Sequence, residues 1–499
     1  MSDTIILVPE MILPSPTAAD MAGDAVVVRN HRIAAIGKPK ELLELWPDAE
    51  VEALTDCLIM AGLVNAHQHG RGISQIQLGY HDDFLELWIS GRRGRGVLDP
   101  YPITKLAAAN MLAHGVTATV NANYTYGSGD YEAEVRASLR AYDETGIRVT
   151  MCIGAMDRGF TVYPPHEACF LAGLPDNLRR WLNRSGANPY AGDADATISL
   201  MDRLLTDYAG HPRIRFCYGP AGPQWVSDEL WTRLARDADR RGIGLHLHAL
   251  ESPAQAAVAA ELYPDGVLAH LESLGAMNSR TTIAHGVWVS DREIDVIART
   301  NATVVHNPGC NLRLRNGTAP LARYLAGGVR VAIGTDNAAL ADDEDLLREL
   351  RLAALLAQTP NWHGAPPPSS TDLLAMSTVN GTVAAQIAPD VGTLEVGKRA
   401  DLIAISLQRV REPYLDADMP VTDALLARAT GLDVRLTMVD GRIIYRDGEL
   451  VGLDRRVIEQ QAAAAAKAAR LPRNPENQLR ARDLREHLVS HYQAGGRSP

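Results

Sequence analysis

The chain has 499 residues, 46% of them hydrophobic, which is enough for one large domain and a smaller one. A formal net charge of −11 argues against nucleic acid or an anionic membrane as a main partner. Five scattered cysteines without a C-x-x-C pair argue against a disulfide framework and favour a reducing compartment. No basic leader or bilayer-length apolar run is present, so we expect a cytoplasmic protein.

The two ends of the chain share a β-rich pattern. Residues 25–28 and 33–37 predict two short strands, and 401–405 predicts another. Residues 435–445 predict a hairpin with Asp-Gly at its turn. We therefore expect residues 1–57 and 390–455 to form one composite β-sandwich domain.

The middle of the chain alternates short apolar runs with helical stretches such as 228–240 and 344–357. The runs are 59–66, 116–120, 148–153, 214–218, 243–248, 281–284, 302–305 and 329–333. Strands that alternate with helices indicate βαβ units and a parallel sheet. Eight of them predict an α/β fold, a (β/α)8 TIM barrel over residues 58–389. The alternative, a doubly wound sheet, is less favoured because no G-x-G-x-x-G follows an early strand.

Two further segments lie outside this pattern. Residues 456–499 predict a helical C-terminal extension, with helices at 455–470 and 479–492 separated by Pro472 and Pro475. We expect it to be a cap or a subunit contact. Residues 155–188 are long for a barrel loop and predict either a lid or a surface insertion.

Polar residues follow several of the predicted strands, where a barrel carries its function. They are His67, His69, His248, His285, His306 and Asp336. An H-x-H pair alone is a weak signal, because 15 histidines give one by chance about half the time, and His246 makes a second pair with His248. The ordered set at successive strand ends is the stronger observation.

Metal chemistry explains this set. Imidazole and carboxylate suit zinc or ferrous iron, and a catalytic site leaves one position for water. Residues i and i+2 of a strand point to the same side, so His67 and His69 can reach one ion, and His248 and Asp336 would complete its shell. A bound metal lowers the pKa of water to about 7, which gives a metal-bound hydroxide at neutral pH. Glu251, three residues after His248, is well placed to carry the proton.

These motifs resemble the amidohydrolase superfamily, in its mononuclear branch of cytosine, guanine and S-adenosylhomocysteine deaminases and s-triazine chlorohydrolases. The matching pieces are GLVNAHQH at 62–69, HALES at 248–252, AHGVW at 284–288, HNPGCNL at 306–312, GTD at 334–336 and VGTLEVGKRADLI at 391–403. The similarity extends over about residues 5–450. It implies the same barrel with a small β-sandwich.

The resemblance also implies roles for single residues. The metal ligands would be His67, His69, His248 and Asp336, and the catalytic residues would be Glu251, His285 and Asp336. His285 would hydrogen-bond the attacking water or the developing oxyanion. His306 and Asn311 would shape the substrate pocket, and His246 would have a structural role or support a ligand.

Three more residues are candidates for the substrate pocket. Gln75, shortly after the histidine pair, could contact a polar heterocycle edge, and Trp88 and Trp225 could stack on a flat ring. Ordinary packing is the alternative for each of them.

The lysines bear on the number of metal ions. Binuclear relatives usually bridge two metals with a modified lysine in the middle strands. The lysines here are Lys38, Lys40, Lys105, Lys398 and Lys467. None lies between residues 106 and 397, so we expect one divalent metal per chain, Zn2+ with Fe2+ as the alternative.

The expected function is that of a metal-dependent aminohydrolase or deaminase. It would attack an amidine-like carbon of a nitrogen heterocycle and release ammonia or an amine. The alternatives are hydrolysis of a cyclic amide or ureide and hydrolytic dechlorination of a triazine-like ring. A non-catalytic scaffold is disfavoured because the whole ligand set is retained. The partner would be a small heterocyclic substrate, and the resemblance favours a homodimer or homotetramer.

Overall fold

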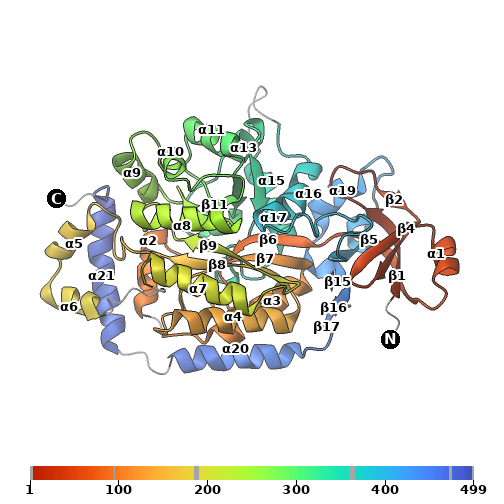
Figure 1. The fold of residues 1–499 in the computed structure, drawn as a ribbon, viewed down its shortest axis with the longest axis horizontal. Coiled ribbons are helices and arrows are strands. Elements are labelled where there is room, and N and C mark those ends of the chain that lie inside the picture. The colour runs from red at the N-terminus through yellow and green to blue at the C-terminus, as the bar shows by residue number, and fades with distance from the viewer. Residues whose placement is uncertain are drawn as a thin grey trace.

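The computed structural model describes residues 4–94, 96–184, 190, 192–358, 366–470 and 475–496. Two sheets organise the described chain: an eight-stranded parallel sheet in the middle and a nine-stranded mixed sheet at one end (Figure 1). Residues 185–188 of the expected loop and Pro472 lie outside the described residues.

The parallel sheet is the predicted barrel. Its strands are β6 (Leu63–Gln68), β7 (Val116–Asn123), β8 (Arg148–Ala155), β9 (Ile214–Pro220), β10 (Leu245–Ala249), β11 (Thr281–His285), β12 (Thr303–His306) and β13 (Arg330–Ile333). Each strand pairs with the next in sequence order. A parallel bridge between Gln68 and Asp336 joins the end of the first strand to the segment after the last. The expected barrel class is confirmed, and its strand ends converge on one face.

The first barrel strand begins later than the sequence predicts. The apolar run 59–66 is divided: β5 (Glu50–Ala61) belongs to the mixed sheet, where Ile59 pairs with Ala404, and β6 begins at Leu63. A Cβ atom on the intervening Gly62 would lie 2.1 Å from the Thr117 hydroxyl oxygen. Glycine is therefore required where the chain passes from one sheet to the other.

The mixed sheet is built from both chain ends. Its other strands are β1 (Thr4–Leu13), β2 (Met21–Ala22), β3 (Ala25–Arg29), β4 (Arg32–Gly37), β14 (Leu402–Ser406), β15 (Val434–Val439), β16 (Arg442–Arg446) and β17 (Glu449–Leu450). Strand β5 pairs in parallel with β1 and antiparallel with β14, which joins the two ends. Asp440 and Gly441 have φ values of 51° and 72° at the predicted hairpin turn. The exact domain boundaries stay our proposal.

Helices surround the barrel, pack on the mixed sheet and continue into the tail (Figure 1). In chain order they are α1 (Pro39–Leu45), α2 (Leu85–Gly91), α3 (Pro100–Ala113), α4 (Tyr131–Thr145), α5 (Glu167–Gly173), α6 (Asp176–Arg184), α7 (Ala194–Asp207), α8 (Asp228–Arg241), α9 (Pro253–Leu262), α10 (Val267–Ser273), α11 (Asp291–Thr300), α12 (Pro308–Arg313), α13 (Leu321–Ala326), α14 (Ala338–Ala341), α15 (Leu346–Leu356), α16 (Ser370–Ser377), α17 (Val379–Ala384), α18 (Gln408–Arg411), α19 (Val421–Arg428), α20 (Arg455–Arg470) and α21 (Pro475–Gln493). Short 3-10 turns occupy Arg92–Gly94 and Gly431–Asp433. In the described part of the chain, no helix combines the length and apolar character needed to cross a membrane.

Both expected tail helices are present. Helix α21 lies beside α5 and α6 at the end of the molecule opposite the mixed sheet (Figure 1). Its Leu484 and Leu488 join one apolar cluster with Leu87 of α2 and Phe170 of α5. The tail helix therefore ties the long loop after β8 to α2.

A buried ion pair joins the barrel to the mixed sheet. Arg148, at the start of β8, donates from Nε and Nη2 to the two carboxylate oxygens of Asp401, each at 2.9 Å. Both side chains are almost fully buried. The amide of Asp440 also donates to Asp401, at 2.8 Å. A two-pronged pair of this kind satisfies both charges, and removing one partner would leave the other unpaired in the interior.

We expect Arg148→Met to lower the free energy of unfolding by about 3–5 kcal/mol, because it leaves the Asp401 carboxylate buried without its partner. Urea denaturation measures this change. Arg136→Met is the control, because Arg136 pairs with Glu132 and Asp207 at the surface and should contribute less than about 1 kcal/mol. Equal losses in the two variants would contradict the expectation.

Candidate active site

The predicted histidine pair lies at the carboxyl end of β6. His67 is fully buried, and the side chain of His69 is 11% exposed. The Nδ1 atom of His67 lies 2.7 Å from Nε2 of His246, and the Nδ1 atom of His69 lies 2.7 Å from the carbonyl oxygen of Ala122. Both rings therefore use Nδ1 within the protein and direct Nε2 towards the same space.

His248 and Asp336 complete the group. The Nδ1 atom of His248 lies 2.8 Å from the Tyr124 hydroxyl. One Asp336 carboxylate oxygen lies 2.9 Å from Nε2 of His69 and 3.5 Å from Nε2 of His67. Burial opposes ionisation of Asp336, but the nearby His69 and His67 hold the pKa of its carboxyl well below the usual value.

This donor set fits a divalent metal ion. The ligand atoms of His67, His69 and His248 lie within 4.8 Å of one another, and so do those of His67, His285 and Asp336. The Nε2 atom of His67 is buried without a hydrogen-bond partner, and this is costly unless another group fills the space. Imidazole nitrogens and a carboxylate are the ligands that zinc and ferrous iron accept.

A chain of hydrogen bonds fixes the orientation of His67. The Thr282 hydroxyl donates to the carbonyl oxygen of Leu245 at 3.3 Å, and it lies 2.6 Å from Nδ1 of His246. With the Thr282 hydroxyl as acceptor, His246 carries its proton on Nδ1 and accepts at Nε2 from His67. The lone pair of His67 is then on Nε2, which is the atom that faces the site.

We expect His246→Leu to weaken zinc binding about 10- to 100-fold, because His67 loses the acceptor that holds its ring. Competition with a chromophoric chelator measures the affinity. His246→Gln retains an acceptor oxygen and should recover part of the loss, and His211→Leu at the surface should change nothing. Wild-type affinity in a folded His246→Leu protein would contradict this role.

Glu251 lies beside the metal-type cluster in the loop after β10. Its Oε1 accepts a hydrogen bond from the Asn316 side chain at 2.9 Å and lies 3.7 Å from Nε2 of His285. Burial, with the charges of Asp336 and Glu86, raises the pKa of the Glu251 carboxyl well above its usual value. A carboxyl group of this kind can hold a proton and release it within the site.

His285 is held in a single orientation. Its Nδ1 lies 2.9 Å from Oδ1 of Asn311, which can only accept, so Nδ1 carries the proton. Its Nε2 is buried without a hydrogen-bond partner and faces Glu251. Burial lowers the pKa of the His285 imidazole.

Three residues at these strand ends have left-handed backbone conformations. Leu250, His285 and Asp336 have φ values of 53°, 73° and 65°, a region that L-residues rarely adopt. Each such residue costs about 1–3 kcal/mol and persists only where the surroundings enforce it. These three positions either belong to the site or adjoin Glu251.

Two of the predicted pocket residues, Gln75 and Trp88, are buried and contact each other. Gln75 is fully buried, and its amide bonds to the Trp88 indole and to Asp82, so both of its ends are engaged within the protein. Trp88 packs with Cys310 in a small apolar cluster. A substrate contact by Gln75 would require one of these bonds to be exchanged.

The remaining predicted residues differ in whether their polar atoms bond to other side chains of the site. Asn311 is engaged with His285 through its oxygen, while its Nδ2 is buried without a partner. His306 is buried with neither ring nitrogen bonded, and burial lowers its pKa to about 4. Trp225 lies edge-on to Tyr163, with ring centroids 5.6 Å apart. The substrate roles of these residues stay predictions.

Three residues with clear contacts to the site were not identified as site residues from the sequence. Asn316 holds Glu251, the Cys310 thiol lies 2.6 Å from Oδ2 of Asp336, and Thr282 holds His246. Thr282 stands directly opposite His246 in the strand register, so pairing of β10 with β11 could have indicated it. No spacing in the sequence indicates the other two.

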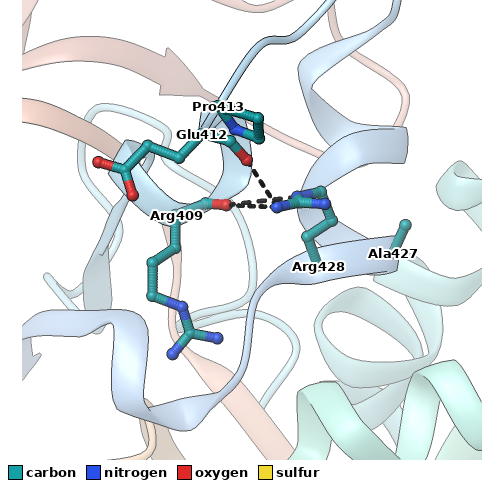
Figure 2. Close-up of a pocket in the computed structure, with 5 residues that line it drawn as sticks. All are labelled: Arg409, Glu412, Pro413, Ala427 and Arg428. Carbon is teal, nitrogen blue, oxygen red and sulfur yellow. Dashed lines mark hydrogen bonds between the residues drawn. The ribbon is translucent and has the colours of Figure 1, made fainter.

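A surface hollow between α18 and α19 is separate from the histidine cluster (Figure 2). It is lined by Arg409, Glu412, Pro413, Ala427 and Arg428. The Arg428 guanidinium donates to the carbonyl oxygens of Arg409 and Glu412 at 3.2 and 2.7 Å. None of its residues belongs to the histidine cluster, so the chemistry points to the barrel end and not to this hollow.

Comparison with known protein families identifies relatives of this chain. The model of the amidohydrolase family matches residues 58–444. The 5'-deoxyadenosine deaminase of Methanosarcina acetivorans is 28% identical over 474 residues, which cover 94% of this chain and 98% of that protein. The 5-methylthioadenosine/S-adenosylhomocysteine deaminase of Moorella thermoacetica is 30% identical over 428 residues, 84% of this chain and 89% of that protein.

Solved structures share the fold. A zinc-bound adenosine deaminase of Xanthomonas campestris matches with a TM-score of 0.78 at 23% identity, over 93% of this chain and 98% of that one. A zinc-bound mutant of the atrazine chlorohydrolase of Arthrobacter aurescens, complexed with atraton, matches with a TM-score of 0.79 at 23% identity, over 93% and 100%. With the family model matching more than half of its length, the chain belongs to the amidohydrolase family.

Proposed function

We propose that this amidohydrolase is a metal-dependent deaminase, which removes ammonia or an amine from an amidine-like carbon of a nitrogen heterocycle. The observation that carries the proposal is the position of the buried Glu251 carboxyl, whose Oε1 lies 3.7 Å from Nε2 of His285, a ring that shares a donor group with His67 and Asp336. The named deaminases among its relatives support the reaction class.

The metal ligands in this proposal are His67, His69, His248 and Asp336. A divalent ion held by them would lower the pKa of a coordinated water to about 7 and supply a nucleophile at neutral pH. We propose zinc as the ion, with ferrous iron as the alternative, because both accept imidazole and carboxylate ligands. The zinc-bound adenosine deaminase and chlorohydrolase structures support zinc.

The protein groups would move the protons. Glu251 would take a proton from the attacking water and deliver it to a ring nitrogen or to the leaving nitrogen. Asn316 would keep the carboxyl in place through its 2.9 Å hydrogen bond. His285, oriented by Asn311, would hydrogen-bond the attacking water or the developing oxyanion.

The substrate class follows from the relatives. Several of them are named as deaminases of 5'-deoxyadenosine or of 5-methylthioadenosine and S-adenosylhomocysteine, so aminopurine nucleosides are the first compounds to test. Dechlorination of a triazine-like ring is the second candidate, supported by the chlorohydrolase fold match. Opening of a cyclic amide or ureide is the third. We also propose a cytoplasmic homodimer or homotetramer without nucleic-acid or membrane partners.

The test is a product screen on enzyme that has been stripped of metal and reloaded with Zn2+ or Fe2+. We expect ammonia release from an amino-heterocycle, loss of activity on chelation and recovery on reloading. Release of chloride would indicate dechlorination in place of deamination. A ring-opened acid would indicate hydrolysis of a cyclic amide or ureide. A metal content well below about one ion per chain, with no product from any class, would refute an enzyme of this type.

A further inference from the structure

A second group of metal-type donors adjoins the four ligands described above. The ligand atoms of Glu251, His285 and Cys310 all lie within 4.8 Å of one another, and all three side chains are buried. Among the described residues, three such donor groups occur, and this is the one that contains a thiol. It shares none of the four residues His67, His69, His248 and Asp336.

The donors of this group are suitable for a cation. The Nε2 atom of His285 is buried, has no hydrogen-bond partner and faces Glu251. The Asn316 side chain donates to Oε1 of Glu251 at 2.9 Å. The sulfur of Cys310 contacts Oδ2 of Asp336 through its proton, and this proton is the one a metal would displace. Sulfur, nitrogen and oxygen donors together are typical zinc ligands.

The charges of these donors also favour the binding of a divalent cation. A thiolate and a carboxylate neutralise the two positive charges of a divalent ion, while the imidazole adds a neutral ligand. In the described part of the chain, the close pair of buried thiols, Cys152 and Cys217 at 3.1 Å, belongs to no such donor group. The cluster at Cys310 is therefore the place where a second thiophilic ion would be bound.

We propose that Glu251, His285 and Cys310 form a second, weaker cation site, and that a thiophilic divalent ion bound there inhibits the enzyme. Binding replaces the Cys310 S–H bond with a metal–sulfur bond and the O–H bond of a protonated Glu251 with a metal–oxygen bond; the displaced protons leave to solvent, without oxidation or reduction. The site is weaker than the first because it offers three donors instead of four and displaces these protons. The inhibition, but not the binding, rests on the proposed role of Glu251 as proton carrier.

The experiment is a titration of metal-free enzyme with Co2+. The first equivalent should bind without a thiolate-to-cobalt charge-transfer band, and the second equivalent should produce that band. Cys310→Ser should lose the band, while Cys57→Ser, which removes a buried thiol in the mixed sheet, should keep it. Circular dichroism checks that both variants are folded.

Activity is followed in the same titration. It should fall in parallel with the band, by about 100-fold or more at saturation, since proton transfer contributes about 10²–10⁴-fold. The second equivalent of Co2+ should not lower the activity of the Cys310→Ser variant below the value that this variant has with one equivalent.

Three results would overturn the proposal: no second equivalent bound, a band that develops with the first equivalent, or inhibition without a band. If the enzyme turns over no substrate at all, the proposed function fails. The number of Co2+ ions bound and the charge-transfer band would still test the second cation site.

Discussion

Replacement of Glu251 by Gln lowers turnover about 10²- to 10⁴-fold, while the metal content stays at about one ion per chain. Glutamine has nearly the same size and can still bond to Asn316, but its amide cannot take a proton from water and deliver it to nitrogen. The expected loss is therefore in kcat, and the metal is retained because none of the four ligands is changed.

Steady-state kinetics and elemental analysis of the same preparations test this expectation. Glu261→Gln is the matched control, because Glu261 lies on α9, pairs with His166 and is remote from the donor cluster. Near-normal turnover in Glu251→Gln would remove Glu251 from the proton-transfer step. Loss of the metal together with activity would make it a ligand instead.

Asp336→Asn should weaken zinc binding at least about 100-fold, since loss of an outer hydrogen-bond partner alone costs about 10- to 100-fold. The variant keeps the shape of the side chain but removes the anionic ligand opposite three neutral imidazoles. Activity should fall with the metal content and return only in part when zinc is supplied in large excess.

Asp342→Asn provides an unusually close control. Asp336 and Asp342 have φ values of 65° and 67°, a conformation that Asn adopts as readily as Asp, so backbone strain is matched in the two variants. Chelator competition measures both affinities. An unchanged zinc affinity in Asp336→Asn would show that the ion, if bound, does not use this carboxylate.

The barrel was predictable because its signal is repeated. Eight apolar runs separated by helical stretches specify a parallel sheet whatever the details of each strand. Polar residues after the runs then fall at one end of the barrel by geometry alone, and this is why His67, His248 and Asp336 could be placed together. The division at Gly62 could not be predicted, because residues on both sides of it are equally apolar and are buried in two different sheets.

The rest of the site depends on how the loops fold back. Asn316 bonds to Glu251 across 65 positions, and the Trp88 indole bonds to Gln75 within a buried wall. These contacts depend on the three-dimensional path of the loops, on which neither spacing nor residue type gives information. Gln75 illustrates the limit: its polarity suggested a contact with substrate, whereas its amide is engaged by two neighbouring side chains.

The bridge between Gln68 and Asp336 has a consequence for biosynthesis. It closes the barrel between segments 268 positions apart (336 − 68), and the proposed ligands His67 and Asp336 lie on the two sides of this closure. A nascent chain cannot assemble the full ligand set until Asp336 has left the ribosome and the last strand has docked on the first. We therefore expect the metal to bind late, after synthesis of the barrel is complete. Unfinished chains would then not bind an ion with an incomplete set of ligands.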